Sequence, residues 1–197
     1  MDLTKKRCFW CNPKNPVYIA YHDEEWGVFP EEEGKLYELF ILETFQAGLS
    51  WECILNKREH FRAAYDGFDR EKICCYTDDK IEELMKNPGI IRNRRKIQAS
   101  IHNTQVYQEI CREFGSFKSY LYSFSHGKTI REPDVRITTS PLSDALSLDL
   151  KKRGMTFVGS TTMYAFLQAV GIINAHQEDC FRYEETVVHA LSAVNAR

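Results

Sequence analysis

The stretch NPGIIRNRRK, residues 87–96, ends one predicted helix and begins the next within a few residues. Pro88 and Gly89 stop a helical pattern that covers residues 78–86, which opens with acids suited to a helix N-terminus. A long helical pattern over about residues 93–113 follows. The sequence therefore predicts two helices joined by a tight hairpin.

The rest of the chain is also mostly helical in pattern, because apolar residues recur at intervals of three and four. Further helices are predicted over 35–47, 52–65, 160–173 and from the cap Ser140 with Pro141 to the basic residues 151–153. Only residues 17–21 and 134–139 look extended, which is too little for a parallel sheet. We expect an all-α fold in a single domain over residues 1–197, with a loop-rich N-terminal arm over residues 1–32.

Composition limits the class of protein. The 197 residues are 43% hydrophobic with a mean hydropathy of -0.44, which is typical of one compact domain. The sequence has no apolar run near the ~20 residues that cross a bilayer, and its start lacks an export segment. An odd number of cysteines, seven, suits a reducing compartment. We expect a cytoplasmic monomer with no membrane partner.

A net charge of -2 and a pI near 6.3 argue against a general attraction to nucleic acid, so any DNA contact needs a local patch. The hairpin offers one, since the turn at Gly89 and Ile90 lets the backbone approach a phosphate and free amides start the next helix. Its cations are Arg92, Arg94, Arg95 and Lys96. A helix connection with a solvated basic face is the alternative, and residues 151–153 are a weaker candidate.

Half of a tetrahedral metal site is visible near the end of the sequence, where His176 and Cys180 are four positions apart. The arm contains Cys8, Cys11 and His22, and it has too little periodicity to hold itself in place. Two ligands from each end would complete a Cys2His2 structural site. Spacing leaves the choice between Cys8 and Cys11 open. Alternatively, the cysteines are small buried residues and His176 caps a helix.

All tryptophans fall in the first 51 residues, interleaved with two tyrosines. Aromatic walls suit a flat heterocycle, and a base turned out of a duplex is bound by stacking and by hydrogen bonds to its edge. Such rings also commonly build a core. The residues concerned are Trp10, Tyr18, Tyr21, Trp26 and Trp51.

Glu43 occupies the apolar face of the helix predicted over 35–47, one turn after Leu39 and one turn before Ala47. A buried carboxylate is costly without partners. A pocket for a cationic or donor-rich ligand explains its position. A structural glutamate would instead need a buried arginine or several backbone amides.

Five motifs appear here in the same order as in bacterial 3-methyladenine DNA glycosylase I, a family of the helix-hairpin-helix glycosylase superfamily. The sequence resembles this family from about residue 7 to residue 180. The motifs are YHDEEWG (21–27), LETFQAGLSW (42–51), PGIIRNRRKI (88–97), KKRGMTFVG (151–159) and IINAHQEDC (172–180).

The resemblance implies a helix-hairpin-helix fold with its hairpin at residues 87–97. It also implies one structural zinc per chain that joins the arm to residues 172–181. The ligands that map from the family are Cys8, His22, His176 and Cys180, and RCFW (7–10) favours Cys8 over Cys11.

The resemblance further implies a pocket that takes a methylated purine from double-stranded alkylated DNA. Glu43 would accept hydrogen bonds from the purine edge, Tyr21 would contact the base and Trp51 would stack on it, with Trp10, Tyr18 and Trp26 around them. Methylation at N3 makes adenine cationic, so its glycosidic bond is already weak and a carboxylate among rings selects it electrostatically. Water would attack C1′ and leave an abasic site, without a lyase step.

Two departures stand out. Many helix-hairpin-helix glycosylases have a second glycine in the hairpin, where this sequence has Ile91. They also have an aspartate some distance past the second helix, whereas this sequence has none between Arg92 and Lys128. Residues 181–197 extend beyond the matched region, and nothing in them indicates a role. The rival interpretations are a zinc-clasped DNA-binding module without catalysis and a glycosylase with a broader range of alkylated purines.

Overall fold

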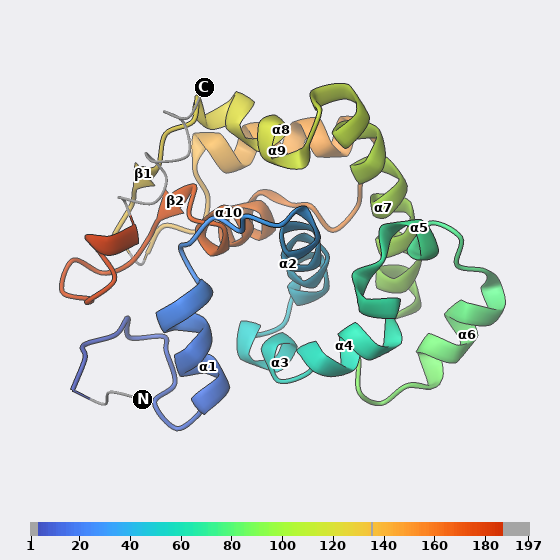
Figure 1. The fold of residues 1–197 in the computed structure, drawn as a ribbon, viewed down its shortest axis with the longest axis horizontal. Coiled ribbons are helices and arrows are strands. Elements are labelled where there is room, and N and C mark those ends of the chain that lie inside the picture. The colour runs from blue at the N-terminus through green and yellow to red at the C-terminus, as the bar shows by residue number, and fades with distance from the viewer. Residues whose placement is uncertain (1–3, 135, 187–197) are drawn as a thin grey trace.

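The computed structural model describes residues 4–134 and 136–186, and most of these are helical (Figure 1). The prediction of a mainly helical fold is confirmed. In chain order the elements are α1 Pro16–Ala20, the π-helical turn η1 Tyr21–Glu25, α2 Glu33–Gln46, α3 Trp51–Leu55, α4 Arg58–Ala64, the 3-10 turn η2 Asp66–Phe68, α5 Arg70–Ile73, α6 Asp78–Lys86, α7 Arg94–Phe114, α8 Phe117–Ser125, β1 Ile130–Arg131, α9 Pro141–Lys152, α10 Ser160–Ala169 and β2 Ile173–Asn174. The two strands form one short parallel pair in which Ile130 is aligned with Ile173.

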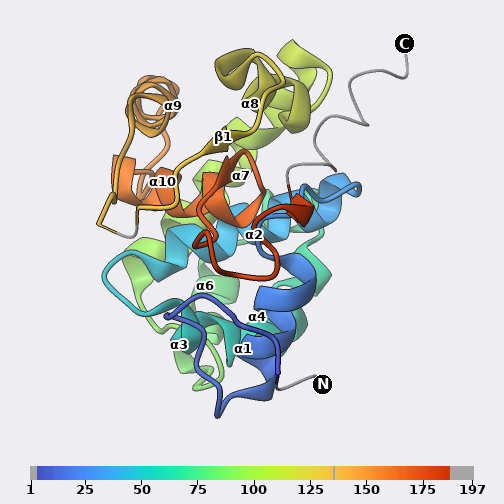
Figure 2. The ribbon, with the colours of Figure 1, turned by 90° about the vertical axis from the view of Figure 1, so that its left-hand side faces the viewer.

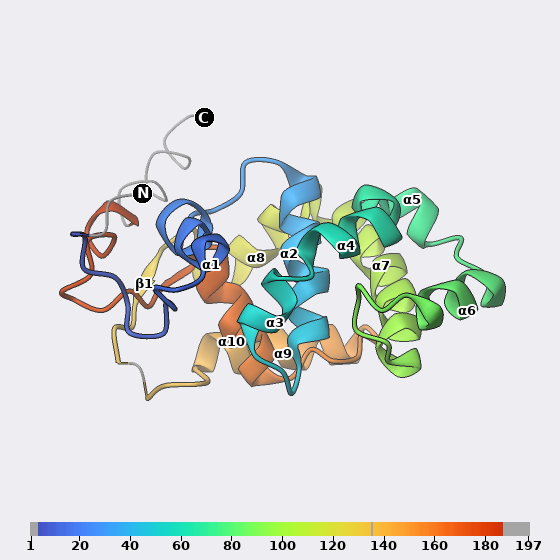
Figure 3. The ribbon, with the colours of Figure 1, turned by 90° about the horizontal axis from the view of Figure 1, so that it is seen from below.

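Helix α2 lies at the centre of the molecule, with α10 beside it and α3, α4 and α7 around it (Figures 1 and 3). Every residue from Leu36 to Phe45 is buried, which is typical of a helix enclosed on all sides. Phe40 packs against Phe117 and Phe166 from other helices, with ring centroids 5.2 and 5.4 Å away. A carboxylate between Leu36 and Phe45 is therefore placed inside the protein whichever way it points.

Several predicted helix boundaries agree with the structure, and local caps define the start of two of these helices. The pattern over 78–86 is α6. Asn93 caps α7 by accepting from the Lys96 amide, and Ser140 forms a capping box with Ser143 at the start of α9.

The prediction of an extended segment over 17–21 is wrong. Asn15 accepts hydrogen bonds from the amides of Val17 and Tyr18, and Pro16 occupies the first helical position. This cap starts α1, which continues directly into η1. The arm predicted to be rich in loops is therefore helical from Pro16 to Glu25.

Other predicted elements differ in extent. The helix predicted over 52–65 is two helices, α3 and α4, separated by Asn56 and Lys57. The helix predicted over 160–173 ends at Ala169, since Gly171 with φ +70° turns the chain into β2. The extended piece predicted over 134–139 includes residue 135, outside the described residues, and the strand lies earlier, at Ile130–Arg131.

The N-terminal arm and the segment after β2 lie side by side at one end of the molecule (Figures 2 and 3). The Phe181 amide donates to the Lys6 carbonyl at 3.0 Å, and the Gly27 amide donates to the Ala169 carbonyl at 3.1 Å. Over residues 4–134 and 136–186, no helix combines the length and the apolar character needed to cross a bilayer.

Gly171 packs against the backbone of Gly27, and this contact leaves no room for a side chain. A Cβ atom at Gly171 would lie 2.3 Å from the Gly27 carbonyl oxygen, and φ +70° disfavours other residues. We expect Gly171→Ala to lower the melting temperature strongly in circular dichroism. Gly34→Ala is the matched control, because a Cβ there meets nothing within 4 Å and alanine favours a helix by about 1 kcal/mol. Equal melting temperatures for the two variants would contradict this account.

Candidate functional site

An aromatic pocket of about 150 Å³ lies between the arm, α2, α3 and α10. It contains all six residues for which a role around a flat ligand was predicted. Its lining is Trp10, Tyr18, Tyr21, Trp26, Glu43, Gln46, Trp51, Ala165 and Gln168. A larger hollow of about 690 Å³ lies elsewhere, at the start of α2, and none of the predicted site residues line it.

The turn η1 directs two successive side chains into different sites. Tyr21 lines the aromatic pocket, whereas His22 points into a cluster of cysteine and histidine side chains. A π-helical turn is uncommon and occurs often at functional sites. Trp51 enters the pocket from the start of α3, where Ser50 accepts a hydrogen bond from the Cys53 amide.

Glu43 is 2% exposed, and its Oε2 atom has no hydrogen-bond partner among residues 4–134 and 136–186. Burial raises the pKa of Glu43 to about 8. The Nε1 atom of Trp51 is also buried without a partner, in the same pocket. An acceptor and a donor left unpaired in one cavity are costly, and a ligand with a donor and an acceptor on its edge would satisfy both.

The buried arginine that a structural glutamate requires is present, but it serves other carboxylates. Arg58 on α4 donates from Nε to Glu38, and its Nη1 atom is 2.9 Å from an oxygen of Glu25. Glu38 and Glu43 share one helix and are both buried. In the part of the chain that the structure describes, Glu38 has cationic partners and Glu43 has none, which leaves Glu43 available to a ligand.

Aromatic rings surround this carboxylate. Tyr21 and Trp51 have centroids 5.2 Å apart, and Trp10 meets Trp26 edge to face at 4.7 Å. Burial raises the pKa of Tyr21, so its hydroxyl keeps its proton. Ring faces and a carboxylate together favour a flat cation over a neutral ring.

The raised pKa of Glu43 has a consequence for stability. Folding raises this pKa from 4.5 to about 8, so the folded state loses stability as the pH rises between these values. We expect Glu43→Gln to be more stable than the parent protein above pH 8, with little gain below pH 4.5. Thermal melts across this range measure the difference. Glu109→Gln, at an exposed position on α7, should follow the parent, and a gain for Glu43→Gln that is independent of pH would contradict the assignment.

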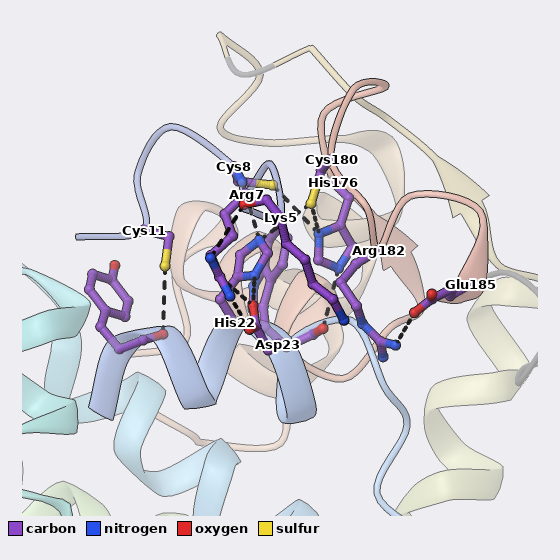
Figure 4. Close-up of polar contacts among 12 residues, drawn as sticks. Lys5, Arg7, Cys8, Cys11, His22, Asp23, His176, Cys180, Arg182 and Glu185 are labelled. Atoms are coloured by element: carbon purple, nitrogen blue, oxygen red, sulfur yellow. Dashed lines mark hydrogen bonds and ion pairs between the residues drawn. The ribbon is translucent and has the colours of Figure 1, made fainter. Parts of the chain in front are cut away.

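A second cluster brings together Cys8, His22, His176 and Cys180, whose ligand atoms all lie within 4.8 Å of one another and are buried (Figure 4). Cys180 Sγ is 3.5 Å from His22 Nε2 and from His176 Nδ1. A tetrahedron with Zn–S ~2.3 Å and Zn–N ~2.0 Å has S–N edges of about 3.5 Å. The Cys11 thiol lies apart from this cluster and donates to the Tyr18 carbonyl.

The outer nitrogen of each histidine is also engaged. His22 Nδ1 is 2.9 Å from Asp23 Oδ1, and Arg7 holds that carboxylate through two nitrogens. His176 Nε2 is 3.4 Å from the Trp26 carbonyl oxygen. Such contacts fix the ring orientation of metal-binding histidines. The Trp26 ring is 4.4 Å from His176, so the cluster supports one wall of the aromatic pocket.

The hairpin residues differ in accessibility. Arg92, Arg94 and Arg95 are exposed, and the Arg94 guanidinium pairs with Glu82. Lys96 was predicted to contact phosphate, but it is 6% exposed and its ammonium donates to the carbonyls of Phe45 and Ala47. The structure therefore contradicts a direct phosphate contact for Lys96.

Two other predicted contacts at this surface are restricted. The Ile90 side chain is 2% exposed, so only its backbone can meet a ligand. In the weaker basic patch, Lys151 and Lys152 are exposed, while Arg153 pairs with Asp149 and Glu113. Counting cations in the sequence overestimates the number that are free.

Three pocket residues were not predicted. Gln46 follows Glu43 by three positions on the same helix, so helical spacing could have identified it. Gln168 is a polar residue within the apolar pattern of α10, which is a weaker signal. Nothing in the sequence distinguishes Ala165 from a core alanine.

A mainly helical fold with a buried, unpaired carboxylate inside an aromatic pocket defines a protein that encloses a flat, donor-bearing ring. The family model described as methyladenine glycosylase matches residues 10–183. The chain therefore belongs to the methyladenine glycosylase family, as its motifs predicted.

Individual relatives agree with this assignment. DNA-3-methyladenine glycosylase 1 of Escherichia coli (strain K12) is 42% identical, over 90% of this chain and 97% of that protein. A crystal structure of 3-methyladenine DNA glycosylase I has a TM-score of 0.85 at 43% identity and covers 89% of this chain and 98% of its own. The Staphylococcus aureus 3-methyladenine DNA glycosylase I, from a structural study of 3-methyladenine recognition, has a TM-score of 0.81 at 38% identity, with coverage of 85% and 92%.

Proposed function

We propose that the protein excises N3-methyladenine from alkylated double-stranded DNA by hydrolysis and leaves an abasic site. The observation that carries this proposal is the Glu43 carboxylate, buried in an aromatic pocket with one oxygen unpaired. The names of the related proteins, which specify 3-methyladenine, support the same substrate.

The pocket suits this base for an electrostatic reason. Methylation at N3 places positive charge on the ring, and a carboxylate between ring faces stabilises that charge. Neutral adenine carries no such charge and gains no such stabilisation. The amino edge of the purine can donate to Glu43, and a ring nitrogen can accept from Trp51 Nε1. These two hydrogen bonds would satisfy both unpaired groups of the pocket.

The reaction needs little help from the protein. The bond between N9 and C1′ breaks, its electron pair neutralises the cationic ring, and water adds to C1′ and releases a proton. The residues that hold the base stabilise it in the orientation in which this bond breaks. None of the residues described as lining the pocket is a lysine, in keeping with hydrolysis without a Schiff-base lyase step.

The hairpin at residues 87–97 would hold the DNA backbone in the manner of a helix-hairpin-helix motif. Lys57 donates to the carbonyls of Pro88 and Gly89, which keeps these negative oxygens from an approaching phosphate. The exposed Arg92 and Arg95 add positive charge next to the start of α7. Extrusion of the nucleotide costs a few kcal/mol, which such contacts would offset.

The cysteine and histidine cluster would hold one structural zinc through Cys8, His22, His176 and Cys180. With four protein ligands the site keeps no open position, so the metal would stabilise the fold and supply no catalytic water. It would join residues 172–181 to the arm, and the arm supplies Trp10, Tyr18 and Trp26 to the pocket. A monomeric state and a cytoplasmic location stay predictions from the sequence.

The test of the substrate is chromatography of the bases released from methylated duplex DNA. We expect 3-methyladenine, with kcat/KM that rises with pH toward about pH 8 as Glu43 loses its proton in the free enzyme. Glu43→Gln should lower release by roughly 100-fold or more and leave binding to unmodified duplex unchanged, with Glu109→Gln as the control. Binding without any released base would indicate a DNA-binding module instead. Equal release of 7-methylguanine or 3-methylguanine would indicate the broader alkylpurine range.

The test of the metal is elemental analysis together with two cysteine variants. We expect close to one zinc per chain, and a large drop in melting temperature for Cys180→Ser because the site loses a ligand. Cys11→Ser should retain the zinc and melt near the parent, since its thiol lies outside the cluster. A folded, metal-free protein that has lost the chemical step would contradict a purely structural role.

A further inference from the structure

Lys96 is a buried cation at the junction of the hairpin and the pocket. Its backbone lies in the first turn of α7, directly after the hairpin, where its amide donates to the Asn93 cap. Its ammonium donates to the carbonyl of Phe45 at 2.7 Å and to that of Ala47 at 2.6 Å. The Phe157 ring lies 5.8 Å away, in the loop before α10. One side chain thus contacts two segments, residues 45–47 and the loop at Phe157, that are far apart from each other in sequence.

Burying an ammonium needs a reason. Burial lowers the pKa of Lys96, and within residues 4–134 and 136–186 no carboxylate lies within ion-pair distance of it. Its partners are carbonyls at the C-terminal end of α2, where the last turn has no intrahelical donors and the helix dipole is negative. The ammonium therefore completes the end of the helix that carries Glu43.

The end of α2 is also the rim of the pocket. Gln46, the last residue of α2, lines the cavity, and the turn over residues 47–50 leads to Trp51 on the opposite wall. In Figure 3 this turn and the start of α7 lie on the same side of the molecule. The Lys96 side chain connects the two through its hydrogen bonds to the carbonyls of Phe45 and Ala47.

A second set of contacts holds the hairpin from the other side. Lys57, between α3 and α4, donates to the carbonyls of Pro88 and Gly89. A Cβ atom at Gly89 would lie 2.8 Å from the His60 side chain, which shows how closely α4 packs on the turn. The hairpin is thus joined to the pocket helix through α4 and, by Lys96, through α7.

We propose that Lys96 is a positioning residue for base excision, which holds the pocket rim in register with the hairpin so that DNA gripped at the hairpin delivers its extruded base to Glu43. This inference rests on the proposed function. Without the ammonium, water would replace it at the two carbonyls and the turn after α2 would move relative to the hairpin. A misplacement of about 1 Å can lower a rate by about 100-fold.

The experiment compares three measurements on Lys96→Met: single-turnover release of 3-methyladenine from methylated duplex, affinity for unmodified duplex, and affinity for free 3-methyladenine by tryptophan fluorescence. We expect the release rate to fall by about 100-fold, while both affinities stay unchanged. Lys96→Arg should recover part of the rate, because a guanidinium can donate to both carbonyls. Lys72→Met, at an exposed position on α5, is the control for loss of one positive charge.

The alternatives give different results. An unchanged release rate per folded molecule overturns the inference, and so does an equal loss of release and of free-base affinity, which would mean that Lys96 maintains the pocket itself. If Lys96→Met does not fold, Lys96→Gln is measured in the same three assays with the same criteria. A parent protein that releases no 3-methyladenine overturns the proposed function, independently of any Lys96 variant.

Discussion

A buried carboxylate, Glu43, that has no cationic partner among the described residues is the constraint on which the rest of this structure depends. Helix α2 contains two buried glutamates, Glu38 and Glu43, which differ in their partners. Glu38 is paired with Arg58 and Arg62, as expected for a charge that stabilises packing. Glu43, further along the helix, has an unpaired oxygen and a pKa raised by burial to about 8. The cost of that burial is offset only when a ligand arrives, so the same helix separates a structural acid from a binding one.

Holding such a group in place requires rigid walls. The turn η1 places Tyr21 in the pocket and His22 in the cysteine and histidine cluster, so adjacent residues of one turn connect the two sites. Trp26 strengthens this connection, because its ring lines the pocket while its carbonyl contacts His176. The cluster is therefore best understood as the anchor of the aromatic wall.

The basic residues illustrate how charge in a sequence differs from charge at a surface. Arg94 and Arg153 form ion pairs with acidic side chains, and the Lys96 ammonium donates to backbone carbonyls. Arg92 and Arg95 stay exposed beside a hairpin whose carbonyls accept from Lys57. A protein with a net charge of -2 can thus present a small positive patch, made by backbone geometry as much as by side chains.

The sequence by itself determined the helical class, the hairpin and the inward direction of Glu43, because caps such as Asn93 and Ser140 and the helical period act over three or four residues. Its ordered motifs also determined the family, whose model matches residues 10–183. The motif RCFW also favoured Cys8 over Cys11, which spacing had left open, and the structure places Cys8 in the cluster. Only the tertiary structure left Glu43 unpaired and turned Lys96 toward Phe45, 51 positions away. These outcomes depend on which distant segments pack together, and the partner of a long side chain is not encoded in its neighbours along the chain.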